Sequence, residues 1–274
     1  MSYKSSTGRN VGKSLEIFQS DKGILGQGVG GGGAAAPTIK AISASGGTET
    51  TFVARDGNNY KVHTFTTVGV STFTISANDP NATYYIQLQG GGAGGGGRKN
   101  SGESGPGGGG GGGSGHSAFF TVSSIPGSYP VIVGYGGSAG PSGGFDGIGA
   151  GNGGLSSLRN PQINITINGG SAGGNSSNQI AGGGGAGGSL LTLTPQPSST
   201  LIYFGGSSVP GLRGNDDQSS GFNGAGGDLW TPIHYNPANL FFRSPDPVNG
   251  RGNGGPGQGG GSAGYARIYY QIPN

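Results

Sequence analysis

The residue types that carry out catalysis or bind metals are few in this sequence and lie far apart. His63, His116 and His234 have no helical or hairpin spacing to a second ligand, so we expect no metal site. Asp216 and Asp217 lie in a loop where no partner can be placed opposite them, and the chain has no cysteine that could act as a nucleophile. We therefore expect no catalytic residues, no cofactor and no enzymatic activity.

Two glycine motifs have spacings close to those of nucleotide-binding loops. The segment "GRNVGKS", residues 8–14, has three residues between its glycines, whereas a phosphate-binding loop needs four. The segment "GQGVGG", residues 26–31, has the dinucleotide spacing but no surrounding strand–helix–strand unit. Only Arg213 and Arg251 directly precede a glycine, so the sequence has no dense arginine–glycine repeat and we expect no nucleic-acid partner.

A proline-punctuated segment, residues 215–249, concentrates aromatic residues and holds the only tryptophan of the chain. Aromatic and arginine side chains anchor interfaces, and aromatic rings also stack on sugars. One hypothesis is that this segment recognises a surface glycan or an outer-membrane protein. The other is that it covers an exposed edge of the glycine-rich part as a small local core. The candidate recognition residues are Trp230, His234, Tyr235, Phe241, Phe242 and Arg243.

The glycine content limits the kind of structure that can position these residues. The chain has 274 residues, of which 69 are glycine and only 9% are charged. Thirteen glycines precede residue 90, and the other 56 lie within residues 90–264. Glycine loses much backbone entropy on folding and buries little apolar area, so an ordinary side-chain core cannot fill most of this chain. No helical apolar period persists anywhere, and we expect an all-β or irregular fold.

Charge and hydropathy give little information about partners. The net charge is +3, and the lysines and arginines are scattered, so no polybasic patch is predicted. The first twenty residues lack the apolar stretch of a signal peptide. No run of about 18 apolar residues occurs, so we expect no membrane insertion.

Two regions are expected before the glycine runs. Residues 1–36 are typical of an attachment arm that docks on a partner through short apolar patches, or else of a terminus that simply leads into the domain. Residues 37–89 alternate apolar and polar positions, and Asp56 and Gly57 supply a hairpin turn, which predicts a small antiparallel β unit. The candidate attachment residues are Leu15, Ile17, Phe18, Ile24 and Leu25.

Residues 90–264 alternate glycine runs with short strand-like segments such as "SAFFTVSSIP" and "SLLTLTP", interrupted by the insertion at 215–249. A last apolar strand follows at residues 265–274. Polyglycine II is an extended threefold helix that rises about 3.1 Å per residue without internal hydrogen bonds, so its backbone groups can bond to several neighbours. The sequence therefore predicts a polyglycine-II helix bundle with short strands.

Three stretches together resemble a known family. They are "HTFTTVGVSTFTISANDPNATYYIQLQGGGAGGGG", "SAFFTVSSIPGSYPVIVGYGGSAG" and "GGPGQGGGSAGYARIYYQIPN". Their order of strand, glycine run, turn at Pro126 and Gly127, "VGYGG" and closing strand is similar to the glycine-rich domain of bacteriophage tail-fibre and adhesin proteins. The resemblance covers residues 63–274, and the insertion at 215–249 departs from it.

This resemblance implies a non-enzymatic virion protein at the phage tail or another exposed particle surface. A tail-fibre or tail-associated adhesin would contact a glycan or an outer-membrane protein of the host. A connector or decoration protein without receptor contact is the alternative. Either would bind other virion proteins of the fibre or baseplate, and both a monomer and a homotrimer remain open.

Overall fold

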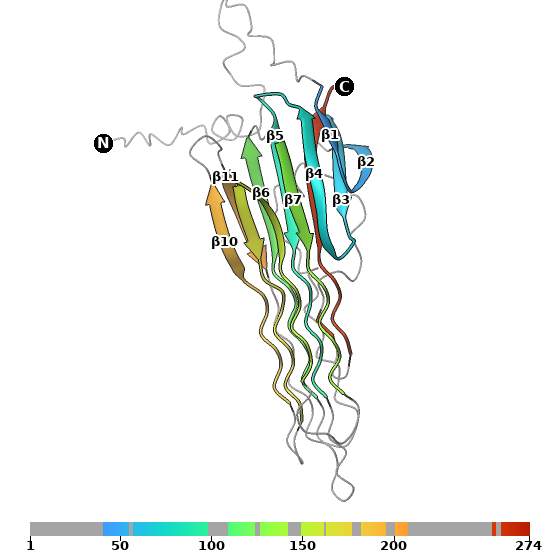
Figure 1. The fold of residues 1–274 in the computed structure, drawn as a ribbon, viewed down its shortest axis with the longest axis vertical. Helices are drawn as coiled ribbons and strands as arrows, with labels where there is room; N and C mark the ends of the chain where they lie inside the picture. Colours follow the sequence, from blue (N-terminus) through green and yellow to red (C-terminus); the bar gives the residue numbers. More distant parts are fainter. Residues whose placement is uncertain are drawn as a thin grey trace, which may run out of the picture. The chain divides into compact units, whose positions relative to one another are not determined.

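The computed structural model describes residues 41–54, 57–97, 109–123, 127–141, 149–161, 163–176, 182–195, 201–207, 254–255 and 259–274. Twelve strands lie within these residues and within the unit Ile39–Asn274 (Figure 1). They are β1 (Ser43–Ser45), β2 (Thr48–Val53), β3 (Asn59–Phe65), β4 (Gly69–Ala77), β5 (Thr83–Gln89), β6 (Ser117–Ser123), β7 (Gly127–Val133), β8 (Ser156–Asn160), β9 (Ile163–Ile167), β10 (Leu190–Pro195), β11 (Leu201–Ser207) and β12 (Tyr265–Ile272).

The strands form two six-stranded sheets in which every pairing is antiparallel. The first sheet has the order β1-β4-β7-β8-β9-β10, and the second has the order β11-β6-β5-β12-β3-β2. Both are rich in the β-branched and aromatic residues that favour a pleated surface. The expected all-β class is thus confirmed.

A hydrophobic core fills the space between the two sheets. Alternation along β5 illustrates its origin, because Tyr84, Ile86 and Leu88 point inward and are fully buried. The same period places one face of every central strand in the core. The other large, fully buried side chains of this core are Phe73, Phe120, Tyr129, Leu158, Ile163, Ile165, Ile167 and Tyr270.

The turn between β1 and β2 carries the chain from the first sheet to the second. Gly46 and Gly47 form this turn with φ values of +114° and +67°, which L side chains rarely adopt. A Cβ at Gly46 would also lie 2.2 Å from the carbonyl oxygen of Thr72. Glycine is therefore required for the crossing at this edge of the sandwich.

The strands between residues 37 and 89 do not make a sheet of their own, which differs from the expected separate unit. Strands β1 and β4 belong to the first sheet, whereas β2, β3 and β5 belong to the second. The closing strand β12 lies between β3 and β5, in the middle of the second sheet. Strands β3, β4 and β5 each pair with a strand from later in the chain, so local pattern alone could not reveal this arrangement. The β2–β3 hairpin is confirmed.

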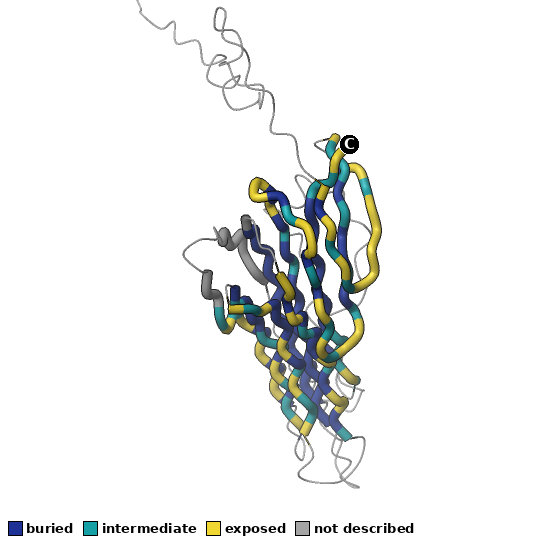
Figure 2. The backbone as a smooth tube through the Cα atoms, turned by 45° about the horizontal axis from the view of Figure 1, so that its top comes forward, coloured by how far each residue is buried: buried dark blue, intermediate teal, exposed yellow. Residues whose placement is uncertain are grey.

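Glycine-rich segments continue the strands beyond one end of the sandwich and run side by side there (Figure 1). They are neither α-helix nor strand. Residues 90–97 and 109–116 are buried throughout, whereas 182–188 alternates between buried and more exposed positions (Figure 2). Because glycine has no side chain, the core of this part consists of backbone.

The hydrogen bonds of residues 91–96 repeat every three residues. The N–H groups of Gly91, Gly92 and Ala93 donate to the carbonyl oxygens of Gly154, Ser262 and Gly113, at 2.9, 2.8 and 2.9 Å. The next three N–H groups return to the same three neighbouring segments, at Gly151, Gly259 and Gly110. A single extended segment therefore bonds in three directions, unlike a strand, whose ladder bonds lie in one plane.

Candidate functional site

The residues singled out from the sequence as recognition or attachment residues lie outside the described part of the chain. This holds for the whole aromatic segment 215–249 and for the N-terminal arm 1–36. The candidate surfaces of the described part are therefore the outer faces of the two sheets and the pocket beside the second sheet.

The outer face of the second sheet follows from the strand register. On β12, Ala266, Ile268 and Tyr270 point into the core, so the residues between them point outward. Tyr269 pairs with Val62 of β3 and with Tyr85 of β5, which places these three side chains on the same outer face.

Aromatic rings pack against one another across this outer face. Phe52 stacks on Tyr60 with ring centroids 6.0 Å apart, and Tyr60 meets Tyr85 edge-on at 6.3 Å. Tyr85 in turn stacks on Phe119 at 6.1 Å, and Tyr269 meets Phe52 edge-on at 6.2 Å. These geometries are the preferred aromatic arrangements. We call this set of rings the aromatic ladder. Because its rings contact one another, the ladder is a packed surface rather than a set of free rings on which a sugar could stack.

Several polar side chains of β12 and β5 lie beside the aromatic ladder and contact one another. Gln87 donates from Nε2 to the hydroxyl of Tyr265 at 2.8 Å, and the hydroxyl of Tyr269 donates to Gln87 Oε1 at 3.2 Å. The guanidinium of Arg267 lies 5.5 Å from the ring centroid of Tyr265. Burial raises the pKa of both tyrosines, and the nearby Arg267 charge opposes this rise. Both phenols are therefore neutral at physiological pH, and the Tyr265 hydroxyl accepts from Gln87 while the Tyr269 hydroxyl donates to it.

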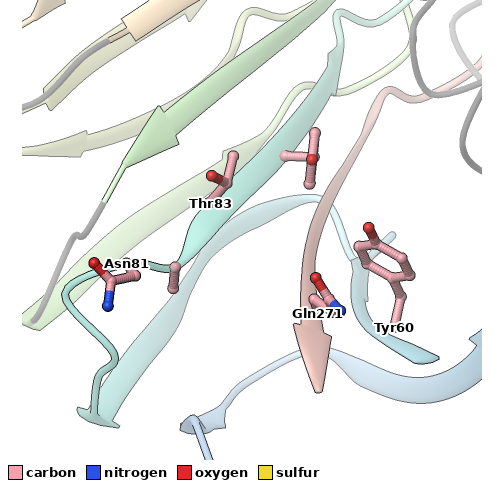
Figure 3. Close-up of a pocket in the computed structure, with 6 residues that line it drawn as sticks. Tyr60, Asn81, Thr83 and Gln271 are labelled. Atoms are coloured by element: carbon pink, nitrogen blue, oxygen red, sulfur yellow. The ribbon is translucent and has the colours of Figure 1, made fainter. Parts of the chain in front are cut away.

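A small pocket opens at the end of this face, and Figure 3 shows its polar side chains. Its volume is about 90 Å³, well below the roughly 300 Å³ at which ligand pockets usually begin. It is too small to enclose a sugar ring, although its amides and hydroxyls could bind a single polar group. The lining residues are Tyr60, Asn81, Ala82, Thr83, Tyr85 and Gln271.

The outer face of the first sheet has a different character. Thr72 is exposed, and the hydroxyls of Thr74 and Ser128 lie 3.2 Å apart on neighbouring strands. Val70 is 73% exposed, and Tyr135 is 59% exposed where β7 continues into its glycine segment. The face is open to solvent at β4, whereas Ser157 of β8 and Thr166 of β9 on the same face are buried.

The two histidines of the described part are buried rather than arranged as a site. His63 is fully buried and pairs with Gly46 and Tyr270, whereas His116 is 9% exposed and lies beside the backbone of Gly188. Burial lowers the pKa of both. Among the described residues, no group of three or more His, Asp or Glu side chains could hold a metal ion.

Sequence reasoning did not identify the aromatic outer face, although the sequence contains a signal for it. In "YARIYYQI" and "TYYIQLQ", aromatic residues occupy both alternating positions of the strand. Strands with large apolar residues on both faces are typical of sheets that are covered on both sides. The functional prediction drew attention to the aromatic residues of segment 215–249 instead.

Comparison of the sequence with family models and with curated proteins gives no function for this chain. No family model matches the chain, and no curated protein matches it. The described residues contain no helix with the length and apolar character needed to cross a bilayer. What the described part defines is a β-sandwich extended by hydrogen-bonded glycine segments.

Proposed function

We propose that this chain is a non-enzymatic structural protein of a bacteriophage virion, a tail-fibre or tail-associated adhesin component exposed on the particle. The observation that carries the proposal is the three-directional hydrogen bonding of residues 91–96. Such a backbone network gives stiffness without a side-chain core. A stiff base suits a protein that must hold contact surfaces in place outside the cell.

The proposal includes a polyglycine-II bundle in the glycine-rich part. Its support is the period of three in the hydrogen bonds, together with the extended course of the segments. Parallel and antiparallel neighbours both occur around residues 90–97: Gly137 and Gly140 donate to Gly92 and Gly95 in parallel order, whereas Gly91 and Gly94 donate to the segment 149–155 in antiparallel order. A threefold helix accepts both directions because its backbone groups point outward all round.

Close backbone approach adds further support. A Cβ at Gly91 would lie 1.9 Å from the carbonyl oxygen of Tyr135, and one at Gly113 would lie 2.0 Å from that of Ala186. Positions packed at this distance tolerate only glycine, since a Cβ there would overlap a neighbouring backbone, whereas Ala93, in the same segment as Gly91, shows that other positions accept a Cβ. The long glycine runs thus have a packing role, and they need not act as linkers.

A second candidate function is a virion connector or decoration protein without receptor contact. It is favoured by the aromatic outer face, whose rings contact one another, and by a pocket too small for a sugar. In either case the arm 1–36 would attach the chain to a fibre or baseplate partner. A homotrimer is one possible assembly, since fibre proteins are commonly symmetric.

Competition for phage adsorption separates the two candidate functions. The purified full chain, shown to be folded by protease resistance, is added to host cells before the parent phage. An adhesin is expected to reduce adsorption in a dose-dependent way, whereas a connector is expected to leave it unchanged. Absence of the chain from purified virions, tested by mass spectrometry of the particle, would contradict both.

A further inference from the structure

The backbone hydrogen bonds of the central segment, residues 90–97, run in closed cycles of three segments. Gly91 illustrates this, because its N–H donates to segment 149–155 and its carbonyl oxygen accepts from segment 168–176, at 2.9 and 3.0 Å. Segment 149–155 in turn donates to segment 168–176, at 2.9 Å. The two residues after Gly91 take part in cycles of the same kind with other neighbours. The N–H and the carbonyl oxygen of one residue thus bond to two segments that also bond to each other.

All backbone hydrogen bonds between two given segments run in one direction. Wherever two of the described glycine segments bond to each other, one supplies only N–H groups and the other supplies only carbonyl oxygens. Segment 168–176, for example, donates to segment 182–189 at every bond between them. Two segments can therefore bond only when a donating side of one meets an accepting side of the other.

Residues 182–189, which we call the glycine edge, lead directly into β10, the edge strand of the first sheet (Figure 1). They accept from segment 168–176 and donate to segment 109–116, and they bond to no other segment that the structure describes. Gly184 and Gly187 have neither their N–H nor their carbonyl oxygen bonded within the described part of the chain. Gly184 is exposed and Gly187 is half-buried. The glycine edge therefore presents a donating side and an accepting side at the same two residues.

The glycine edge lacks the features that prevent a second backbone from pairing with it. Proteins usually protect a free backbone edge with charged side chains or proline, and residues 182–189 contain neither. The only side chains of the glycine edge are those of Ala186 and Ser189. Ala93 is fully buried in the central segment, which shows that an alanine is accepted where segments pack on all sides. A partner must likewise present extended backbone without large side chains, and a second copy of the glycine edge has this property.

The direction of the bonds decides the symmetry of such an assembly. A two-fold pair would place like groups opposite each other, donors against donors or acceptors against acceptors, so no bonds would form. In a three-fold ring of parallel copies, each glycine edge donates to the next copy and accepts from the previous one, which reproduces the cycle around Gly91. Parallel neighbours already occur in the chain, because the glycine edge donates to segment 109–116 in parallel order.

We propose that the glycine edges of three copies of this chain pack in parallel around a three-fold axis, where Gly184 and Gly187 of each copy donate to one neighbour and accept from the other. The ring bonds the backbone groups that the single chain leaves exposed. It makes specific the homotrimer that the virion proposal leaves open. The inference rests on the hydrogen-bond pattern and not on the virion role, so its failure would leave that role untouched.

Light scattering coupled to size-exclusion chromatography tests the ring on the full chain. The unchanged chain is expected to have three times the mass of one copy. The double variant Gly184→Glu, Gly187→Glu places large side chains of like charge in the contact and should be a monomer that is still folded by circular dichroism, because neither glycine has a positive φ.

The matched control is Gly149→Glu, at another exposed glycine where a Cβ meets no atom within 4 Å. This variant should remain a trimer. A monomer or a dimer of the unchanged chain would overturn the proposal, and so would a folded double variant that is still a trimer.

Cross-linking tests the parallel direction without a variant that weakens the contact. Because the chain has no cysteine, Ser189→Cys introduces a single thiol at the exposed end of the glycine edge. In a parallel ring this position lies beside its own counterpart in the next copy, so a short bismaleimide should join two chains covalently. Thr72→Cys, which is exposed on β4 at the opposite side of the first sheet, is the control and should not be joined. Cross-linking of Ser189→Cys that is no stronger than that of Thr72→Cys would refute the ring.

Discussion

The hydroxyl of Tyr270 lies 3.1 Å from Nε2 of His63, and the two rings stack with centroids 5.6 Å apart. Nδ1 of His63 lies 2.7 Å from the carbonyl oxygen of Gly46, which can only accept, so Nδ1 carries the proton and Nε2 accepts from Tyr270. Burial raises the pKa of Tyr270 to about 12, so its hydroxyl remains a donor. This relay joins β12, β3 and the sheet-crossing turn.

Removing the Tyr270 hydroxyl should destabilise the sandwich. Tyr270→Phe leaves the buried Nε2 of His63 without a donor, which costs about 1–3 kcal/mol of unfolding free energy. Denaturant unfolding followed by circular dichroism measures the change. Tyr135→Phe removes a hydroxyl from a side chain that is 59% exposed, and it should change stability by less than about 0.5 kcal/mol. Equal effects of the two substitutions would argue against the relay.

Acid should destabilise the fold through its buried histidines. Burial lowers the pKa of His63 and of His116 below 6.5, so the folded state holds both rings neutral while the unfolded state takes up protons. The free energy of unfolding therefore keeps its full value above about pH 6.5. It decreases as the pH drops further, by at most about 1.4 kcal/mol per pH unit for each histidine.

The measurement for this prediction is the unfolding free energy between about pH 8 and pH 5. His116→Asn replaces a titrating ring by a neutral amide and should reduce the slope on the acid side, whatever it does to stability at neutral pH. A slope that is the same in the variant would show that His116 does not contribute.

Glycine substitutions should differ sharply according to position. Gly91→Ala places a Cβ 1.9 Å from the carbonyl oxygen of Tyr135, and we expect a loss of more than about 3 kcal/mol or failure to fold. A Cβ at Gly183 meets no atom within 4 Å, so Gly183→Ala should be tolerated. Thermal unfolding and resistance to protease measure both. Similar behaviour of the two variants would contradict the close backbone packing.

Hydrogen exchange should reveal the glycine-rich part as ordered. Each N–H of residues 91–96 donates to a neighbouring segment, and all six residues are buried. We expect their amide protons to exchange as slowly as those of β5, which directly precedes them. Mass spectrometry of peptides from residues 83–97 provides the comparison. Rapid exchange confined to 91–96 would contradict the hydrogen-bonded arrangement.

Local signals predicted part of this structure. The alternating residues around Asp56 and Gly57 predicted the β2–β3 hairpin, and the lack of a helical period predicted the all-β class. These features depend on neighbours within a few residues, where side-chain period and turn chemistry act directly. The glycine runs likewise indicated that backbone, rather than side chains, must pack over a long part of the chain.

The tertiary structure alone decided how the strands are shared between the sheets. Nothing local to "YARIYYQI" shows that β12 inserts between β3 and β5, or that β1 and β2 belong to different sheets. The ladder from Phe52 to Phe119 likewise depends on register across β2, β3, β5 and β6. Antiparallel pairing between distant strands is determined by which faces can be buried together, a property of the whole chain that a linear pattern does not contain.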